Sequence, residues 1–279
     1  MTPFYLMESE AESQRLLVKN YRDKTEQQLV KAGILSLDKN SKLVDAGCGV
    51  GHVAEVMDDL LRRSFKQPEI YMLDISRPRL SAAKSRLEAD QNTDYHYITC
   101  DITRPIPLPS NSIDFVVCRF VFEYLNNQQA AFNELYRIVK PGGKLILGDL
   151  DYNCMTHYPL DHDLEQKLFS LVRTLEKGRL FDAHAGRKLY SFFERAQLDD
   201  IKVHFSDHHL FYGDLPESDD FNWTAKLDRL IDHQKNGTIH FDFDLIEFKN
   251  SFRDFLKSPG RFSYTPLILV EGRKPHGRK

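Results

Sequence analysis

The sequence predicts an α/β protein built around a mostly parallel sheet. Apolar runs with the length of buried strands recur along the chain, and segments with helical spacing lie between them. The strands are expected at residues 43–47, 69–74, 95–99, 113–118 and 144–149. Alternation of strands and helices produces βαβ units, in which helices cover both faces of a parallel sheet.

The helices between these strands are defined by the spacing of their apolar residues. One helix is expected from Val53 to Phe65, with one face made by Val53, Val56, Leu60 and Leu61. A second is expected from Gln128 to Val139, with one face made by Ala131, Leu135 and Ile138. The segment from Lys140 to Gly143 then ends this helix and turns the chain into the fifth strand.

Composition places the chain among ordinary globular proteins. It has 279 residues, of which 41% are hydrophobic and 28% charged, enough for one large core or two small ones. A net charge of −3 provides no basic field for a phosphate backbone, so a nucleic-acid substrate is disfavoured. We expect a monomer or homodimer.

The cysteines and the lack of long apolar segments indicate the cellular compartment of the protein. The four cysteines show no CxxC spacing, which disfavours a zinc site or a disulfide framework. The sequence has no signal peptide and no apolar run of about 18 residues, so a cytoplasmic protein without a membrane span is expected.

A glycine-rich turn follows the first strand, where Asp45 is succeeded by Gly47, Gly49 and Gly51. Glycines permit positive φ and let backbone N–H groups approach a ligand at the start of the next helix. The GxGxxG fingerprint of dinucleotide-binding proteins would need a third glycine where this chain has His52, which disfavours a nicotinamide-dependent oxidoreductase. A tight structural corner without a ligand is the other interpretation.

Charged residues end or follow the predicted strands. Asp45 and Asp74 close the first and second strands, Asp101 follows the third, and Arg119 follows the fourth. Ligands of such sheets bind at the carboxyl ends of the strands. Asp74 is suited to accept hydrogen bonds from a ribose diol, although it could instead cap the next helix, a role that Ser76 could also take.

Together these motifs resemble the class I S-adenosylmethionine-dependent methyltransferases. The run from Asp45 to Gly51 resembles their first motif, an acid followed by GxGxG. The segment 105–125 resembles their fourth strand and the short helix after it, and 137–147 is similar to the entry to the fifth strand in ubiquinone- and menaquinone-biosynthesis-type methyltransferases. The resemblance implies a Rossmann-like sheet of seven strands in the order 3-2-1-4-5-7-6.

The same resemblance implies S-adenosyl-L-methionine as the cofactor. Asp101 would accept a hydrogen bond from the adenine amino group, although a loop aspartate often binds its own backbone instead. The cofactor-binding residues are then expected to be Asp45, Gly47, Cys48, Gly49, Gly51, Asp74, Ile75, Cys100, Asp101, Ile102, Arg119 and Phe120.

Beyond residue 150 the resemblance is looser. Residues 185–198 resemble the helix before the sixth strand, which is expected at 201–212, and 265–272 should form the seventh, antiparallel strand. Residues 1–40 are expected to form an N-terminal helical cover, with a helix begun by a capping box at residues 9–12. Residues 41–279 would be the methyltransferase domain, in which 214–258 insert a cap of two helices.

Candidate catalytic residues lie where the sulfonium methyl is expected. His157 is the first candidate for a general base, because histidine titrates near neutral pH, and Tyr152 and Glu123 are comparable candidates. Methyl transfer itself requires mainly that a nucleophile be held in line and water excluded. His204, His208 and His209 lack accompanying acidic ligands, so no metal site is predicted.

The predicted function is methyl transfer to an oxygen or nitrogen of a small, partly apolar or aromatic metabolite. A closed pocket under a helical cap suits such an acceptor. One alternative is a methyltransferase acting on tRNA or protein, although the chain has Cys118-Arg-Phe-Val where base-methylating enzymes carry an Asn-Pro-Pro-Tyr-type motif. Another is a catalytically silent cofactor-binding protein that acts through a partner.

Overall fold

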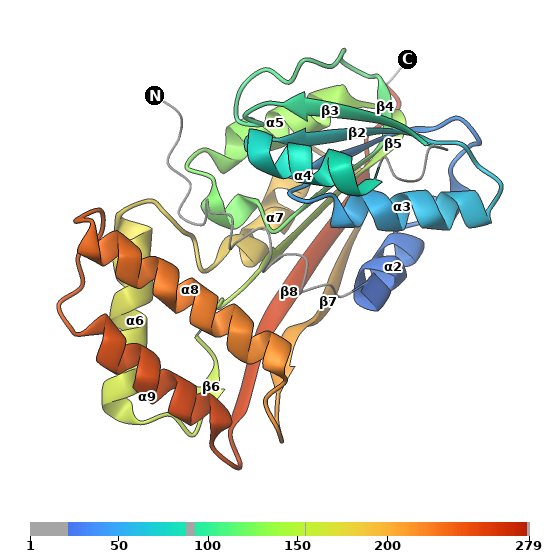
Figure 1. The fold of residues 1–279 in the computed structure, drawn as a ribbon. Coiled ribbons are helices and arrows are strands. Elements are labelled where there is room, and N and C mark those ends of the chain that lie inside the picture. The colour runs from blue at the N-terminus through green and yellow to red at the C-terminus, as the bar shows by residue number, and fades with distance from the viewer. Residues whose placement is uncertain (1–21, 88–92, 154, 278–279) are drawn as a thin grey trace.

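The protein has a mixed sheet with helices on both faces and a separate group of three helices near one end (Figure 1). The computed structural model describes residues 22–87, 93–153 and 155–277. The capping box at residues 9–12, and the helix it predicts, lie outside the described residues.

The sheet has the predicted strand order. Five parallel strands run in the order β3-β2-β1-β4-β5, and β8 and then β7 follow, both in antiparallel pairings. Since β7 and β8 are the predicted sixth and seventh strands, this is the order 3-2-1-4-5-7-6. The bounds are β1 Lys42–Ala46, β2 Glu69–Asp74, β3 Asp94–Thr99, β4 Ile113–Arg119, β5 Val139–Leu150, β7 Asp199–Phe211 and β8 Phe262–Arg273.

Two elements were not predicted. A strand of two residues, β6 (His157–Tyr158), pairs with the start of β8 and is too short to give a sequence signal. Helix α6 (His162–Lys177) does have such a signal, because its buried residues Leu164, Leu168, Leu171 and Leu175 recur at helical spacing. The strand β5 also begins earlier than expected. It includes the predicted turn 140–143, beside a register shift in its pairing with β4.

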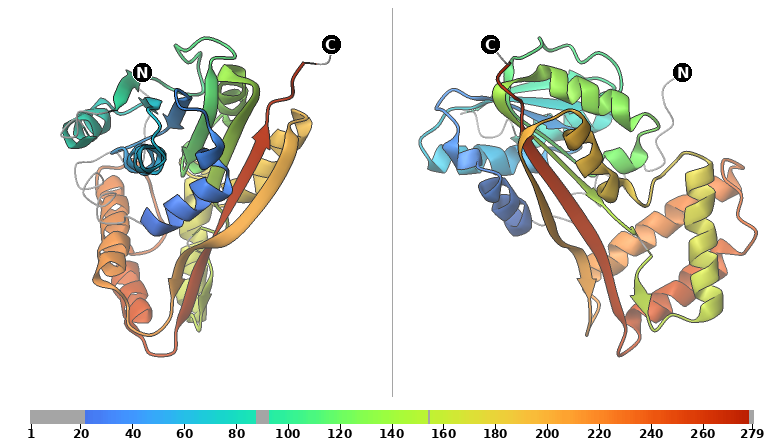
Figure 2. Two further views of the ribbon diagram at one scale, coloured as in Figure 1. Left: turned by 90° about the vertical axis from the view of Figure 1, so that its right-hand side faces the viewer. Right: turned by 180° about the vertical axis from the view of Figure 1, so that it is seen from behind.

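Strand residues alternate between two cores. Leu43, Phe115 and Val117 face the helices α2 (Arg22–Lys31), α3 (His52–Arg63) and α4 (Arg77–Leu87). The residues next to them in sequence, such as Val44 and Val116, face α5 (Gln128–Ile138) and α7 (Ala185–Arg195). The period of two is that of a strand buried on both faces, and Figure 2 shows the helical layers on either side of the sheet.

Helix α2 is the described part of the predicted N-terminal cover. It packs on α3, and ion pairs join Arg22 to Asp59 and Glu26 to Arg63. A 3-10 turn, η1 (Ile34–Ser36), then leads from α2 to β1. Figure 1 shows α2 beside the long strands β7 and β8, and Lys24 of α2 forms an ion pair with Asp207 of β7.

Three helices form the group near the end of the sheet, which we call the cap. Helices α8 (Glu217–Lys235) and α9 (Leu245–Lys257) fall within the expected insertion 214–258 and pack on α6. Asp161 and Asp244 cap the N-termini of α6 and α9 with side-chain hydrogen bonds. The cap has its own apolar core, which includes Trp223, Phe248 and Phe252. No helix in the described part of the chain is long and apolar enough to cross a membrane.

Candidate functional site

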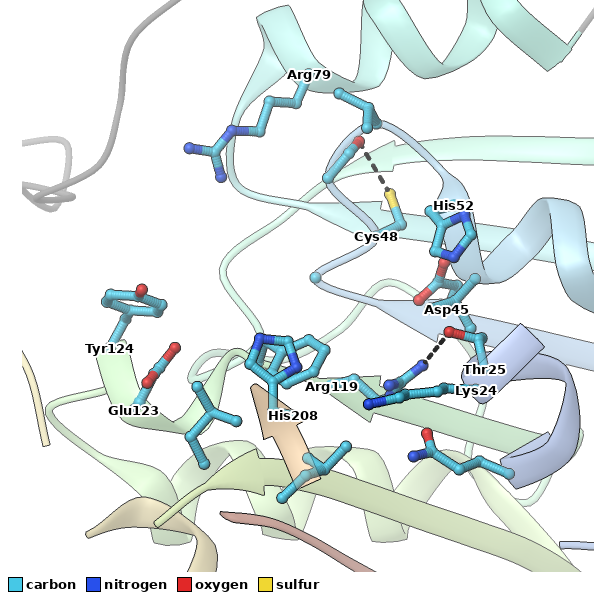
Figure 3. A pocket seen from close by; sticks show the side chains of 18 of the residues that line it. Lys24, Thr25, Asp45, Cys48, His52, Arg79, Arg119, Glu123, Tyr124 and His208 are labelled. Carbon is cyan, nitrogen blue, oxygen red and sulfur yellow. Dashed lines mark hydrogen bonds between the residues drawn. The ribbon is translucent and has the colours of Figure 1, made fainter. Parts of the chain in front are cut away.

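Two adjoining pockets lie at the carboxyl ends of the central strands, and Figure 3 shows the one that contains Arg119. The first, which we call the Arg119 pocket, has a volume of about 170 Å³ and is lined by residues that include Asp45, Gly47, Arg119, Glu123 and His208. The second, which we call the Asp101 pocket, measures about 230 Å³ and is lined by residues that include Asp74, Ile75, Cys100, Asp101 and Ile102. Both are lined by Gly47, Arg79, Phe120 and Tyr124, so they form one continuous site.

The glycine turn after β1 shapes the site. Gly47, Gly49 and Gly51 all have positive φ, at 71°, 54° and 83°. A Cβ on Gly47 would lie 2.2 Å from Cγ2 of Val121, so only glycine fits there. A Cβ on Gly51 would lie 2.7 Å from Cε of Met72, and Gly51 lines neither pocket. Gly47 and Gly49 thus face the site, whereas Gly51 allows α3 to pack closely on the sheet.

Asp74 ties the end of β2 to this turn. Its carboxylate accepts hydrogen bonds from the backbone N–H groups of Gly49 and Ser76, each at 2.8 Å. The cap of α4 is provided by Ser76, whose hydroxyl lies 3.4 Å from the N of Arg79. Asp74 is 5% exposed and lines the Asp101 pocket. A carboxylate has about four acceptor positions, so it can accept hydrogen bonds from ribose hydroxyls as well as from backbone N–H groups.

Asp101 forms the local turn that the sequence left open as an alternative. Its Oδ1 accepts hydrogen bonds from the backbone N and the hydroxyl of Thr103, at 2.9 and 2.7 Å. Its Oδ2 lies 3.4 Å from Nε of Arg104. Asp101 also lines the pocket together with Cys100, Ile102 and Ile75. Its contact with adenine therefore stays a prediction.

Asp45, near the end of β1, is buried beside the first turn of α3. Its Oδ2 accepts a hydrogen bond from the N–H of Ala54 at 3.0 Å, which fixes the helix to the end of β1. Burial raises the pKa of this carboxyl to about 7, against the opposing effects of the Ala54 hydrogen bond and of the charge on Arg119. Asp45 and Cys48 both line the Arg119 pocket.

Arg119 brings a guanidinium into the same pocket. Its Nη1 donates a hydrogen bond to Oγ1 of Thr25 on α2, at 2.9 Å, and the group stacks over the ring of Phe120. Burial lowers its pKa to about 10, so it remains charged at neutral pH. Its Nε is buried and has no hydrogen-bond partner among the described residues. The site thus offers a charged donor to an anionic group of a ligand.

Glu123 is the one predicted catalytic residue that lines the Arg119 pocket. It follows β4 in the 3-10 turn η2 (Phe122–Tyr124) and is buried. Its Oε2 accepts a hydrogen bond from Nδ2 of Asn153 at 2.8 Å, and its N–H donates to Oδ2 of Asp149 at 3.1 Å. Burial and the charge of Glu123 raise the pKa of Asp149 well above its usual range.

The other two predicted catalytic residues lie elsewhere. The ring of His157 packs against Trp223 and Phe252 in the cap, and its Nδ1 lies 2.8 Å from Oγ of Ser263. Tyr152 is 44% exposed, with the guanidinium of Arg187 over its ring. Neither residue lines the Arg119 pocket or the Asp101 pocket.

Several lining residues were not predicted from the sequence. They come from segments that only the fold brings to the strand ends, and they are Lys24 and Thr25 on α2, Arg79 on α4, His208 on β7 and Lys226 on α8. Figure 3 shows Lys24 and Thr25 beside Arg119, and His208 between that group and Glu123. The ring of His208 lies 4.8 Å from that of Phe120. No spacing pattern in the sequence connects these positions.

The strand order, the glycine turn after β1 and the acid at the end of β2 define a class I methyltransferase fold. The comparison with known families agrees. Residues 44–147 match the family model described as methyltransferase domain, so this part of the chain is a methyltransferase domain.

Relatives with different substrates share this part of the chain. A chicken (Gallus gallus) protein named tRNA N(3)-cytidine methyltransferase METTL2 is 27% identical over 164 residues, which cover 57% of this chain and 41% of the relative. A malonyl-[acyl-carrier protein] O-methyltransferase of Serratia marcescens is 30% identical over 118 residues, 42% of each chain. The chain thus spans less than half the length of these relatives.

The fold also resembles solved structures over most of the chain. Phosphoethanolamine N-methyltransferase 2 of Haemonchus contortus, solved with phosphomonomethylethanolamine and S-adenosylhomocysteine, superposes with a TM-score of 0.55. The match covers 91% of this chain and 53% of that protein, at 15% sequence identity. At this low sequence identity, the match shows a similar fold and nothing about the substrate.

Proposed function

We propose that the chain transfers a methyl group from S-adenosylmethionine to an oxygen or nitrogen of a small, partly apolar or aromatic metabolite. The observation that carries the proposal is the pairing, in one pocket, of the glycine turn with a buried guanidinium whose Nε has no described partner. An amino acid carboxylate is the kind of group that such a guanidinium binds.

The residues of the two pockets fit the parts of this cofactor. Arg119 would bind the carboxylate of the methionine moiety, Asp74 the ribose hydroxyls, and the side chains around Cys100 and Ile102 the adenine ring. When bound, the cofactor supplies a methyl group activated on a sulfonium. The chain's own residues then hold the acceptor in line with that methyl and keep water away.

We propose that Glu123 acts on the acceptor. It is buried, lines the Arg119 pocket and is oriented by Asn153. An ionised carboxylate there could accept a proton from the attacking hydroxyl or amine. We propose this role for Glu123 rather than for His157 or Tyr152, because those two side chains do not reach the pocket.

Replacing Arg119 by methionine tests the cofactor's orientation. We expect the affinity for S-adenosylhomocysteine to fall about tenfold or more, since a hydrogen bond to a charged group contributes roughly 1.5–3 kcal/mol. The affinity for 5′-methylthioadenosine, which lacks the amino acid, should stay within about twofold of the original value. Calorimetric titration measures both. An equal loss for the two ligands would contradict the proposed orientation.

The acceptor class is tested by turnover. With saturating S-adenosylmethionine, we expect methylation of compounds in a panel of small carboxylates, phenols and amines, and none of tRNA or of a protein extract. The charge supports this choice, because a chain with a net charge of −3 offers little attraction for nucleic acid. Turnover only with tRNA would favour the chemistry of the METTL2 relative instead. Cofactor binding without any turnover would favour a silent binding protein.

A further inference from the structure

A separate apolar cavity lies inside the cap. It has a volume of about 70 Å³, and apolar side chains line most of it, including Leu168, Leu171 and Leu175 on α6 and Leu227 and Leu230 on α8. One water molecule needs about 10–15 Å³ of such space. The cavity therefore has room for several atoms of a ligand, and its walls favour apolar ones.

This cavity adjoins the Arg119 pocket. Tyr124 and Lys226 line both, so they mark the junction between them. A ligand that extends from the Arg119 pocket past Lys226 would enter an apolar environment.

Lys226 places a positive charge at this junction. The side chain is partly buried, and its Nζ lies 5.4 Å from the centre of the Trp223 ring. Within the described ranges, no carboxylate lies within 4 Å of its ammonium group, whereas Lys24, which also lines the Arg119 pocket, is paired with Asp207. An ammonium beside an apolar cavity attracts an anion more strongly than one in open water.

We propose that the acceptor is a small amphiphilic anion. Its apolar chain or ring occupies the cap cavity, and its carboxylate or phosphate group pairs with Lys226. This inference rests on the proposed function, and it orients the acceptor. Because Lys226 lies between the cavity and the Arg119 pocket, the polar end of the acceptor faces the cofactor site and carries the atom that is methylated.

The test uses the single tryptophan of the chain, Trp223, which lines the cavity and lies next to Lys226. Its fluorescence is titrated with octanoate, octyl phosphate and octanol, all below their micelle-forming concentrations. We expect saturable binding of the anions, and octanol should bind about tenfold more weakly than octanoate because it lacks the charge. Affinity should rise about fourfold per methylene from hexanoate to octanoate. Comparison of octanoate with octyl phosphate distinguishes the two headgroups.

Two variants separate the headgroup from the chain. Lys226→Met should reduce octanoate affinity about tenfold and leave octanol affinity unchanged, whereas Lys235→Met, on the exposed end of the same helix, should change neither. Leu171→Phe partly fills the cavity and should remove the dependence on chain length. Thermal melting followed by circular dichroism checks that each variant is folded.

Three results would overturn the inference. They are an absence of saturable binding, equal affinities for octanoate and octanol, or an unchanged octanoate affinity in Lys226→Met. Calorimetric titration of the same protein with S-adenosylhomocysteine distinguishes a failure of the amphiphile proposal from a failure of the methyltransferase proposal. If S-adenosylhomocysteine binds and the alkyl anions do not, the methyltransferase proposal stands and the amphiphile proposal fails.

Discussion

Replacing Asp74 by alanine is expected to weaken binding of S-adenosylhomocysteine by at least about a hundredfold. Hydrogen bonds from two ribose hydroxyls to a buried carboxylate contribute roughly 1.5–3 kcal/mol each, and about 2.7 kcal/mol corresponds to a hundredfold in affinity. The substitution also removes the acceptor for the N–H groups of Gly49 and Ser76, so the glycine turn loses one of the contacts that hold it to β2. The N–H groups of Gly47 and Cys48 still donate to the carbonyl oxygen of Leu73 in that strand.

Calorimetric titration measures this loss, and Asp94→Ala provides a matched control. Asp94 begins the neighbouring strand β3, and its side chain is 73% exposed at the opposite end from the pockets. The control should bind S-adenosylhomocysteine like the original protein. An Asp74→Ala variant that is folded and binds within about fivefold of the original affinity would rule out the ribose contact.

Replacing Gly47 by alanine is expected to destabilise the fold and abolish cofactor binding together. A non-glycine residue at positive φ costs about 1–2 kcal/mol. The new Cβ would also lie 2.2 Å from Cγ2 of Val121, and the Cβ and Cγ1 of that stiff side chain would be 3.4 Å away. We therefore expect the free energy of unfolding to fall by about 3 kcal/mol or more, as measured by urea denaturation.

Gly213→Ala separates the two contributions to this effect. Gly213 has a φ of 65°, close to the 71° of Gly47, but a Cβ there would have no atom within 4 Å. This control should lose only about 1 kcal/mol and should bind S-adenosylhomocysteine normally. The double variant Gly47→Ala/Val121→Ala should recover part of the lost stability. Equal losses for Gly47→Ala and Gly213→Ala would show that contact with Val121 is unimportant.

The predictions that succeeded are those for which neighbouring residues supply the signal. The apolar runs at 69–74 and 113–118 correspond closely to β2 and β4, because a buried strand must be apolar along its whole length. Asp45, Asp74 and Arg119 meet at one edge of the sheet because parallel strands place their carboxyl ends side by side. Gly51, which the resemblance predicts to bind the cofactor, lines neither pocket, and its positive φ and close packing require glycine without any ligand.

Two of the candidate catalytic residues, His157 and Tyr152, lie outside the two pockets, and for His157 the physical reason is the path of the chain. His157 follows the fifth strand closely in sequence, but the chain turns away after β5 and pairs as β6 with the start of β8. The direction of a loop depends on what it packs against, and here that is the cap helices α8 and α9. The spacing of residues in the loop carries no information about these partners.

The sequence by itself determined the class of fold, the strand order implied by its resemblance, and the part of the site built by the ends of β1, β2 and β4. These features depend on local periodicity and on turns a few residues long. The tertiary structure alone decided that Lys24 and Thr25 of α2, His208 of β7 and Lys226 of α8 line the same pocket. Those residues are separated by many positions in the chain, and only burial of the apolar faces of their helices and strands brings them together.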